Sequence, residues 1–362
     1  MSWFFVFGVP LVLTLVLTPI IKKIAIKINA VDHPDERKVH TKVMPRLGGL
    51  AIFLSSSIGM LIFSDITEGP LLWIMLGSLV IITLGIIDDL KPLSAKIKLV
   101  FQVVAASILI YGGIDIEFIN IPMSDKVVYL GNWSYLISIL WIVGITNALN
   151  LIDGLDGLAA GVSSISLATI LIMSLSMGNN LVTTIALAVL GSTLGFLVFN
   201  FHPAKIFLGD SGSLYLGFIL ATLSILGFKN VAVVSFIFPI IILAVPLFDT
   251  IFAIIRRFRI KAPITVADKK HLHHCLIEMG FSHRKTVFII YGISIIFGLA
   301  AIFLSQASFW MGLIIIVTLM FITLIGIEWT GVIGGTKKPV THLCRLIGNR
   351  IVRFANNPYF KG

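Results

Sequence analysis

Eleven uninterrupted apolar segments run through this chain of 362 residues, and each is about long enough to cross a membrane as a helix. The hydrocarbon core of a bilayer is about 30 Å thick, which a helix of about 20 apolar residues spans. Hydrophobic residues make up 57% of the chain and charged residues 12%, against about 25% charged residues in an ordinary soluble domain. The chain is therefore predicted to be an all-α polytopic membrane protein, which excludes a soluble enzyme, a disordered chain and a disulfide scaffold. The segments cover residues 3–21, 47–63, 71–87, 97–113, 134–149, 158–177, 181–199, 212–228, 231–252, 286–304 and 309–328.

The distribution of basic residues predicts the orientation of these segments. When the loop 22–46 is placed in the cytoplasm and the sides alternate from there, 25 of the 27 Lys and Arg residues lie inside, and Lys126 and Lys229 lie outside. Because basic residues are retained on the cytoplasmic side, the N-terminus is predicted outside and the C-terminus inside. All eight histidines and both cysteines fall on the inner side, where we expect reduced thiols and any chemistry.

The chain is predicted to form one integral membrane domain, residues 1–328, followed by a basic cytoplasmic tail, residues 329–362. The first apolar segment lacks a basic n-region and a cleavage site, so we expect a retained helix and not a signal peptide. In the tail, apolar residues at helical spacing alternate with basic ones, which indicates an amphipathic helix on an anionic inner leaflet. A plain stop-transfer tail is the alternative.

Two adjacent acids, Asp88 and Asp89, lie at the end of the third apolar segment. Carboxylates at membrane depth are costly and usually functional. Lys91, Lys96 and Lys98 follow, so the pattern predicts a site that binds a divalent cation and phosphates together, because Mg²⁺ prefers carboxylate and phosphate oxygens. Solvated loop charges are the alternative.

A polar stripe in the segment NALNLIDGLDG places Asn147, Asn150, Asp153 and Asp156 at every third position. At this spacing the side chains share roughly one face of a helix or tight turn. The glycines between them allow a ligand to approach the backbone. The stripe predicts a ligand-binding site, and an interhelical hydrogen-bond ladder is the alternative.

The segment FLGDSGS carries Asp210 at the start of another apolar segment. The start of a helix offers free backbone N–H groups for an anion, and the carboxylate could hold the metal bound to that anion. A helix N-cap is the alternative. Asn200 and Phe207 belong to the compact re-entry loop before it, which a simple cap would not need.

Two further groups of cationic or hydrogen-bonding side chains lie in the cytoplasmic loops. His271, His273 and His274 stand beside lysines, and because the thiolates and spacing of a structural zinc site are missing, diphosphate binding is favoured over zinc. Arg46, in the segment PRLGG, lies just before a predicted helix start. The retention of basic residues on the cytoplasmic side does not explain why a positive charge is placed at that position. We therefore count Arg46 among the phosphate-binding candidates.

The remaining patterns separate an enzyme from a transporter. No GxxxxGK[ST] or GxGxxG motif is present, so ATP-driven transport has no support. Ionisable residues are nearly absent from the segment centres, with Asp249 as the chief exception, whereas an ion-coupled transporter places them near the midplane. We predict an enzyme at the membrane face with no nucleic-acid partner. A lipid-linked-sugar transporter or flippase is the alternative.

With these motifs in the order DD, NxxNxxDGLDG, FLGDSGS and HLHH, the chain resembles the polyprenyl-phosphate N-acetylhexosamine-1-phosphate transferases. This is the glycosyltransferase 4 family of MraY, WecA and TagO proteins. PRLGG and HLHH stand where MraY proteins carry a TPTMGG-like loop and HHH followed by Phe-Glu, so the chain is similar to the WecA/TagO branch. The resemblance implies about eleven transmembrane helices in the bacterial inner membrane and an active site that faces the cytoplasm.

The resemblance also implies a reaction. An N-acetylhexosamine-1-phosphate, in this branch usually GlcNAc-1-phosphate, moves from a UDP-sugar to undecaprenyl phosphate with release of UMP. This step initiates synthesis of an envelope polymer such as teichoic acid or O-antigen. The family implies a requirement for Mg²⁺, with Mn²⁺ as a substitute, and its MraY relatives imply a homodimer.

Site roles follow from the same resemblance. Asp210 matches the metal-binding aspartate, Asp88 and Asp89 match aspartates that deprotonate the lipid phosphate or bind the metal, and Lys96 matches a lysine near the phosphates. The DGLDG segment matches nucleotide-binding positions of the family together with Asn200 and Phe207, and the resemblance implies that the Phe207 ring stacks on uracil. The remaining matches are Asn147, Asn150, Asp153 and Asp156 in the central motif and His271, His273 and His274 in the histidine motif. A lipid phosphate is already largely ionised near neutral pH, since its second pKa is about 6. A positioning and metal role for Asp88 is therefore favoured over obligatory base catalysis, and single and double displacement both stay open.

Overall fold

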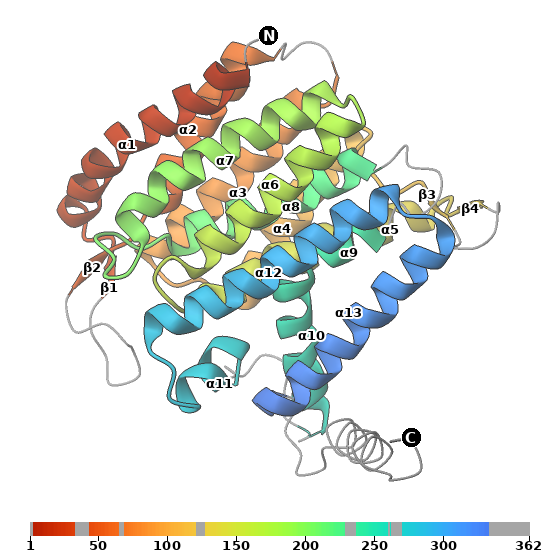
Figure 1. Ribbon diagram of the computed structural model, residues 1–362. Helices are drawn as coiled ribbons and strands as arrows, with labels where there is room; N and C mark the ends of the chain where they lie inside the picture. The colour runs from red at the N-terminus through yellow and green to blue at the C-terminus, as the bar shows by residue number, and fades with distance from the viewer. Residues whose placement is uncertain are drawn as a thin grey trace, which may run out of the picture.

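The apolar segments fold into a bundle of helices in the computed structural model (Figure 1), which describes residues 3–32, 43–64, 69–120, 127–228, 237–259, 261 and 270–332. In Figure 1 most of the long helices run alongside one another, whereas α10 and α13 leave this common direction. The helices are α1 (Trp3–Lys27), α2 (Gly48–Phe63), α3 (Leu71–Leu90), α4 (Ala95–Tyr111), α5 (Trp133–Ile152), α6 (Leu158–Ser176), α7 (Asn180–Asn200), α8 (Gly209–Phe228), α9 (Ile237–Ile242), α10 (Ala244–Arg259), α11 (Leu272–Glu278), α12 (His283–Gln306) and α13 (Phe309–Thr330).

Eight of the described helices are long and apolar enough to cross a membrane: α1, α3, α5, α6, α7, α8, α12 and α13, while α2 is a shorter apolar helix. The predicted class, a helical polytopic membrane protein, is therefore confirmed. Two short antiparallel strand pairs were not predicted from the apolar pattern. They are β1 (Val31–Asp32) with β2 (Met44–Pro45), between α1 and α2, and β3 (Phe118–Asn120) with β4 (Val127–Tyr129), between α4 and α5.

The ninth apolar segment does not form one continuous helix over its described residues. It divides into α9 and α10, with a break at Leu243. Pro246 lies in the first turn of α10 and has no N–H to donate to the carbonyl four residues earlier, so one helical hydrogen bond is missing next to this break. The prediction of one uninterrupted span over 231–252 was wrong in this respect. The predicted amphipathic tail lies outside the described residues from residue 333 onward.

Helix α8 is the most enclosed of the eight candidate spans and carries one of the predicted site residues in its first turn. Of its apolar window 83% is buried, compared with 11% for α13. Helices α3 and α5 pack against it. The hydroxyl of the fully buried Tyr215 in α8 forms a hydrogen bond of 2.7 Å with that of Ser56 in α2, which satisfies two polar groups that would be costly alone in an apolar core. Asp210 is therefore positioned by the inner helix of the bundle.

The backbones of α2 and α3 reach that of α8 through glycines. A Cβ atom on Gly49 would lie 2.0 Å from the backbone nitrogen of Gly212, and one on Gly85 would lie 2.3 Å from the Cα of Ser211. Small residues permit such close approach between membrane helices. The contacts leave the first turn of α8 little room to move.

Gly49→Ala is expected to destabilise the protein by about 2–3 kcal/mol or more, because overpacking against a backbone cannot be relieved by a side-chain rotation. The measurement is the thermal unfolding midpoint of the purified protein in detergent. Gly8→Ala in α1 is the matched control, since nothing lies within 4 Å of the added Cβ. Alanine favours the helix over glycine, so this control should unfold at the same temperature or slightly higher. Equal midpoints for the two variants would contradict the close approach.

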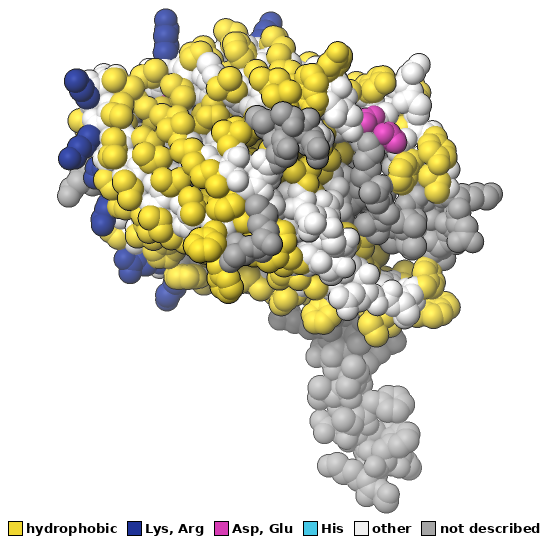
Figure 2. All heavy atoms as spheres, turned by 90° about the horizontal axis from the view of Figure 1, so that it is seen from above, with side chains coloured by type: hydrophobic (Ala, Val, Ile, Leu, Met, Phe, Trp, Pro, Cys, Tyr) yellow, Lys and Arg dark blue, Asp and Glu magenta, His cyan; other side chains and the backbone are white. Residues whose placement is uncertain are grey.

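Charged side chains are segregated along the bundle. Figure 2 shows one face covered mostly by hydrophobic side chains, with Lys and Arg mainly toward the left of the view and a small acidic patch at the upper right. The helix ends agree with this view, because Lys27 lies in the last turn of α1, and Arg256, Arg257 and Arg259 lie in the last turn of α10. We call the end of the bundle where α1 finishes and α2 begins the basic end.

Candidate active site

Two carboxylates and one ammonium group meet at the basic end, where α3 finishes and α4 and α8 begin. The Lys98 Nζ atom lies 2.5 Å from Asp88 Oδ2 and 2.6 Å from Asp210 Oδ2. Asp88 Oδ1 accepts a further hydrogen bond of 2.7 Å from the backbone of Leu93. Asp88 is buried, whereas the side chain of Asp210 is 24% exposed. A ligand can therefore approach this cluster from the side of Asp210.

The second predicted acid, Asp89, has a different environment. Its two carboxylate oxygens accept hydrogen bonds from the backbone N–H groups of Asp210, at 2.9 Å, and Ser211, at 3.1 Å. These groups belong to the first turn of α8, where N–H groups have no partner within the helix and the helix dipole favours a negative charge. Asp89 therefore caps α8 from α3 and fixes the position of Asp210.

Asp89→Ala is expected to lower the free energy of unfolding by about 2–4 kcal/mol, because two buried N–H groups lose a charged acceptor. Thermal or chemical unfolding in detergent measures this loss. Ser94→Ala is the control: the Ser94 hydroxyl caps the exposed start of α4 by a bond of 3.4 Å from the backbone of Ile97, and its loss should cost about 0.5–1 kcal/mol. If Asp89→Ala cost no more than this control, Asp89 would not be a buried cap.

Arg46 faces the acidic cluster from the connection between β2 and α2. Its Nη2 atom lies 2.9 Å from Asp32 Oδ1, and its Nη1 atom lies 4.0 Å from Asp89 Oδ1. The backbone N–H of Arg46 donates to the carbonyl of Ala30 at 2.9 Å. The guanidinium group is thus held beside the acids and remains partly exposed, at 28%.

The PRLGG segment and the loop before α8 are joined by backbone hydrogen bonds. Phe207 donates to the carbonyl of Pro45 at 2.9 Å and accepts from Gly48 at 3.1 Å, and Gly49 donates to Leu208 at 2.9 Å. These bonds place Phe207 next to the segment that carries Arg46. Its side chain is partly exposed, as binding of a ligand to the ring would require.

The amides of the central motif bind neighbouring helices. Asn147 and Gln102 of α4 exchange two hydrogen bonds, of 2.6 and 3.2 Å. Asn150 donates to the hydroxyl of Ser213 in α8 at 2.8 Å. Asn147 and Asn150 therefore form hydrogen bonds between helices, which was the alternative to a ligand-binding site for this motif. They connect α5 to the helices that carry Lys98 and Asp210.

The two acids of the DGLDG segment lie in the connection between α5 and α6. The residue Asp153 is partly exposed, yet its carboxyl group is packed within protein, and this burial raises its pKa to about 8, with the charges of Asp210 and Asp89 acting in the same direction. Asp156 accepts hydrogen bonds from the His202 ring at 2.8 Å and from the backbone of Ala204 at 3.1 Å. The structure therefore brings Asp153 into the field of the acidic cluster, while the Asp156 carboxylate is bound by His202 and Ala204.

Asn200 is a structural link between loops. Its oxygen accepts from the backbone of Gly157 at 3.1 Å, and its nitrogen donates to the carbonyl of Ile206 at 3.0 Å. The side chain is buried. Asn200 therefore joins the DGLDG segment to the loop that carries Phe207.

The histidine motif reaches the DGLDG segment through one ring. His273 is 2% exposed and packs so closely on Gly154 that a Cβ there would lie 2.3 Å from its Nε2 atom. Burial lowers the pKa of His273 to about 3, and the neighbouring His274 adds to this shift, so the ring is neutral near pH 7. His271 is bound instead to Asp249, at 2.7 Å, and the other oxygen of Asp249 accepts from the backbone of Leu272. The acid in the ninth apolar segment thus anchors α11.

Lys96 and Lys98 have different positions on α4. Lys96, which the resemblance singled out, is exposed, whereas Lys98 bridges the two acids. Residues two positions apart point to widely separated sides of a helix, and the sequence alone did not tell which side of α4 meets α3 and α8. Gln102, four residues after Lys98 and also polar, marks the inner side of α4 and would have favoured Lys98.

The residues of the cluster fit a divalent cation bound through oxygen. Asp88 and Asp210 each direct one oxygen at the same point, which the Lys98 ammonium occupies. Both oxygens of Asp89 bind backbone N–H groups instead. Carboxylate oxygens with room for phosphate oxygens are the ligands that Mg²⁺ prefers. Of the three predicted metal ligands, Asp88 and Asp210 have the suitable geometry.

The part of the chain that holds most of this site matches a known family of enzymes. Residues 71–228, from α3 to α8, match the model of glycosyl transferase family 4, and the chain belongs to this family. A probable undecaprenyl-phosphate N-acetylglucosaminyl 1-phosphate transferase from Bacillus subtilis is 49% identical over 95% of this chain and 96% of the relative.

More distant relatives separate the branches of the family. A decaprenyl-phosphate N-acetylglucosaminephosphotransferase from Mycolicibacterium smegmatis is 35% identical over 87% of this chain and 86% of the relative. A phospho-N-acetylmuramoyl-pentapeptide-transferase from Staphylococcus carnosus is 30% identical over 83% of this chain and 97% of the relative. The predicted family is confirmed, and these similarities agree with the WecA/TagO-like branch.

Proposed function

We propose that this protein transfers N-acetylglucosamine-1-phosphate from UDP-N-acetylglucosamine to undecaprenyl phosphate and releases UMP. The observation that carries the proposal is the meeting of Asp88, Asp210, Lys98 and Arg46 at one end of a membrane bundle. Transfer between a lipid phosphate and a sugar nucleotide needs cations and metal-binding acids at the membrane surface, because phosphoryl transfer depends on positioning and charge neutralisation. The name of the B. subtilis relative, at 49% identity, supports this donor and acceptor.

In the proposed reaction an oxygen of the lipid phosphate attacks the β-phosphorus of the UDP-sugar. The bond from the β-phosphorus to the bridging oxygen breaks, and that oxygen leaves on UMP with its electron pair. The lipid phosphate is largely ionised near neutral pH, so no protein base has to remove a proton first. The Lys98 ammonium and the Arg46 guanidinium would donate hydrogen bonds to phosphate oxygens as negative charge shifts toward UMP.

Asp88 and Asp210 are the residues that would hold Mg²⁺, or Mn²⁺ in its place. The metal supplies Lewis-acid stabilisation of the diphosphate and of the leaving UMP. Asp89 would act through the position of Asp210, since it caps α8. The neutral ring of His273 would serve as a hydrogen-bond donor beside the DGLDG segment and not as a cation.

The proposed setting is the bacterial inner membrane, with eleven crossings, the N-terminus outside and the basic end in the cytoplasm. In this arrangement α2 and α4 are short crossings, and α9 with α10 makes the ninth. The retention of basic residues on the cytoplasmic side supports the orientation, because the last turn of α1, at the basic end, carries Lys27, and Lys98 and Arg46 lie at the same end.

The test is UMP release by the purified protein from UDP-N-acetylglucosamine, undecaprenyl phosphate and Mg²⁺, with the lipid product identified by thin-layer chromatography. We expect UMP in proportion to lipid product, loss of both with EDTA, and recovery with Mg²⁺ or Mn²⁺. A panel of other UDP-N-acetylhexosamines in the same assay identifies the preferred donor. A lipid-linked-sugar transporter would leave the diphosphate intact, so the absence of UMP with every donor, from monodisperse protein, would contradict the proposal.

A further inference from the structure

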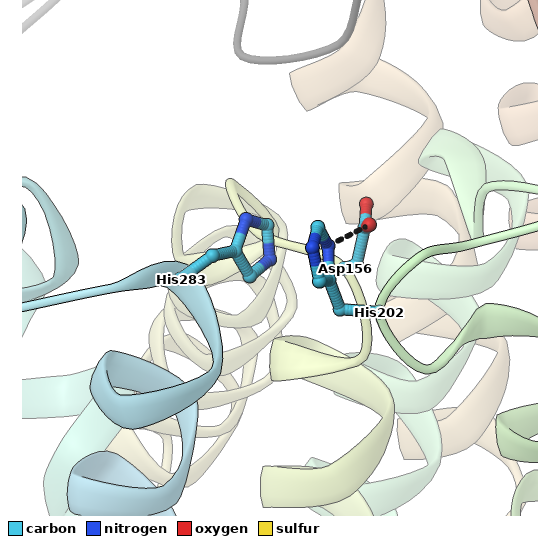
Figure 3. Close-up of side chains that lie close together, drawn as sticks. All are labelled: Asp156, His202 and His283. Carbon is cyan, nitrogen blue, oxygen red and sulfur yellow. Dashed lines mark hydrogen bonds and ion pairs between the residues drawn. The ribbon is translucent and has the colours of Figure 1, made fainter.

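Three side chains from separate parts of the chain meet at the basic end, one of them within the DGLDG segment. Asp156 comes from the α5–α6 connection, His202 from the α7–α8 connection, and His283 is the first residue of α12. Each offers one ligand atom, and these atoms all lie within 4.8 Å of one another. Figure 3 shows the three side chains converging, with the His202 ring hydrogen-bonded to the Asp156 carboxylate.

His283 has unused hydrogen-bonding capacity in this group. Both of its ring nitrogens are buried, and neither makes a hydrogen bond of normal geometry with the described residues, although the ring lies close enough to the backbone of Asp156 for a weak polar contact. Its ring stacks on that of His202, with centroids 4.2 Å apart. A buried polar nitrogen without a partner is costly, and most such groups in folded proteins are satisfied. The imidazole could turn toward a ligand without losing a hydrogen bond to another side chain.

The chemistry of the donors points to a particular class of cation. Two imidazole nitrogens and one carboxylate oxygen suit Zn²⁺ and similar late first-row metals, whereas Mg²⁺ prefers oxygen ligands alone. Ligand atoms around a tetrahedral Zn²⁺ lie about 3.4 Å apart, given Zn–N and Zn–O bonds of about 2.1 Å. Since the ligand atoms lie at most 4.8 Å apart, the widest pair has to close by no more than about 1.4 Å. Three protein ligands would leave a fourth position open.

The surrounding contacts orient two of the donors. The backbone N–H of Ala204 binds the same Asp156 oxygen that faces His202, at 3.1 Å. Arg284 donates to the backbone carbonyl of His202 at 3.0 Å and so joins the start of α12 to the α7–α8 connection. Partners of this kind fix the direction of metal-binding side chains.

We propose that Asp156, His202 and His283 form a binding site for a transition-metal cation of the Zn²⁺ class. This site offers two nitrogen ligands and one oxygen ligand, whereas Asp88 and Asp210 offer oxygen ligands alone. In the part of the chain that the structure describes, it is the one group of three such side chains with ligand atoms this close. The histidines first considered for zinc fit less well, because His271 is bound to Asp249 and His273 is packed on Gly154. A bound cation would hold the DGLDG segment, the α7–α8 connection and the start of α12 together.

The experiment is a titration of the full-length, metal-stripped protein with Co²⁺ in excess Mg²⁺, which saturates the site of Asp88 and Asp210. The proposal expects one equivalent of Co²⁺ with the visible absorption of a four- or five-coordinate ion, displaced by Zn²⁺. His283→Asn and His202→Asn should each weaken Co²⁺ binding by more than about tenfold. His342→Asn, which changes a histidine outside the described residues, is the matched control and should bind Co²⁺ as the wild type does.

Thermal unfolding provides a second readout. Zn²⁺ should raise the unfolding midpoint of the wild type and of His342→Asn but not of the two ligand variants, because a ligand that binds the folded state stabilises it. Gel filtration and the unfolding midpoint in EDTA show whether each variant is folded. If only one of the two ligand variants folds, that variant is sufficient for the test. Unchanged Co²⁺ absorption in a folded ligand variant, or none in the wild type, would overturn the proposal. Since no substrate is present, this result is independent of the test of UMP release.

Discussion

Asp210→Asn is expected to lower kcat for UMP release by about 10³-fold, or about 4 kcal/mol in the activation barrier. The substitution removes one charged oxygen from the point where Asp88, Asp210 and Lys98 meet. It leaves the start of α8 intact, because Asp89 caps that helix through the backbone N–H groups of Asp210 and Ser211. Reduced activity should therefore accompany an unchanged unfolding midpoint in EDTA.

Binding of Mn²⁺, measured by electron paramagnetic resonance, separates a metal ligand from a residue that contacts only substrate. Asp210→Asn should weaken Mn²⁺ binding. Asp115→Asn is the control for the same change of side chain: Asp115 accepts from the Ser134 hydroxyl at 2.5 Å and lies past the other end of α4. An asparagine oxygen can still accept that bond, so the control should match the wild type. Near-wild-type turnover of Asp210→Asn at saturating Mg²⁺ would show that Asp210 does not bind the metal.

Much of this fold could be predicted from the sequence because the bilayer imposes a length on every crossing. The apolar segments therefore predicted the positions of most helices, with ends within a few residues. The ninth segment is the exception, since its hydropathy continues through Leu243 while Pro246 breaks the helix. The strand pairs were missed because each lies in a connection, where pairing depends on the helices on either side and not on an apolar pattern.

The candidate site was predictable to the level of motifs but not of contacts. Asp88 and Asp210 are 122 residues apart in number. Asp88 was selected because adjacent carboxylates at the end of an apolar segment are costly, and Asp210 because it lies at the start of another apolar segment. Asp89 has a different role from Asp88 and Asp210 because its carboxylate faces the backbone of α8. The spacing of residues in the sequence does not predict which of the two adjacent acids faces that backbone. The meeting of His202 with His283 likewise depends on how α12 packs beside α6, so the sequence showed only that both histidines lie on the same side of the membrane.

Lys98→Met is expected to lower kcat for UMP release by about 10²- to 10³-fold, while Lys96→Met should leave it close to the wild-type value. Lys98 is the cation held by both Asp88 and Asp210, and in the proposed reaction it donates to the phosphates. Lys96 lies exposed on the same helix, two residues earlier. The two variants change the same residue type to the same side chain, so their difference reports the face of α4 on which each lysine lies.

Mn²⁺ binding distinguishes the loss of Lys98 from the loss of a metal ligand. The Lys98 ammonium contacts the same carboxylate oxygens that a metal would use, so it competes with the metal for them. Removing it leaves two carboxylates with mutual repulsion, and a divalent cation relieves that repulsion. Lys98→Met should therefore bind Mn²⁺ at least as tightly as the wild type while turning over slowly, whereas Asp210→Asn loses both properties. Weaker Mn²⁺ binding by Lys98→Met would contradict this competition, and a comparable loss of turnover in Lys96→Met would contradict the assignment of Lys98 to the site.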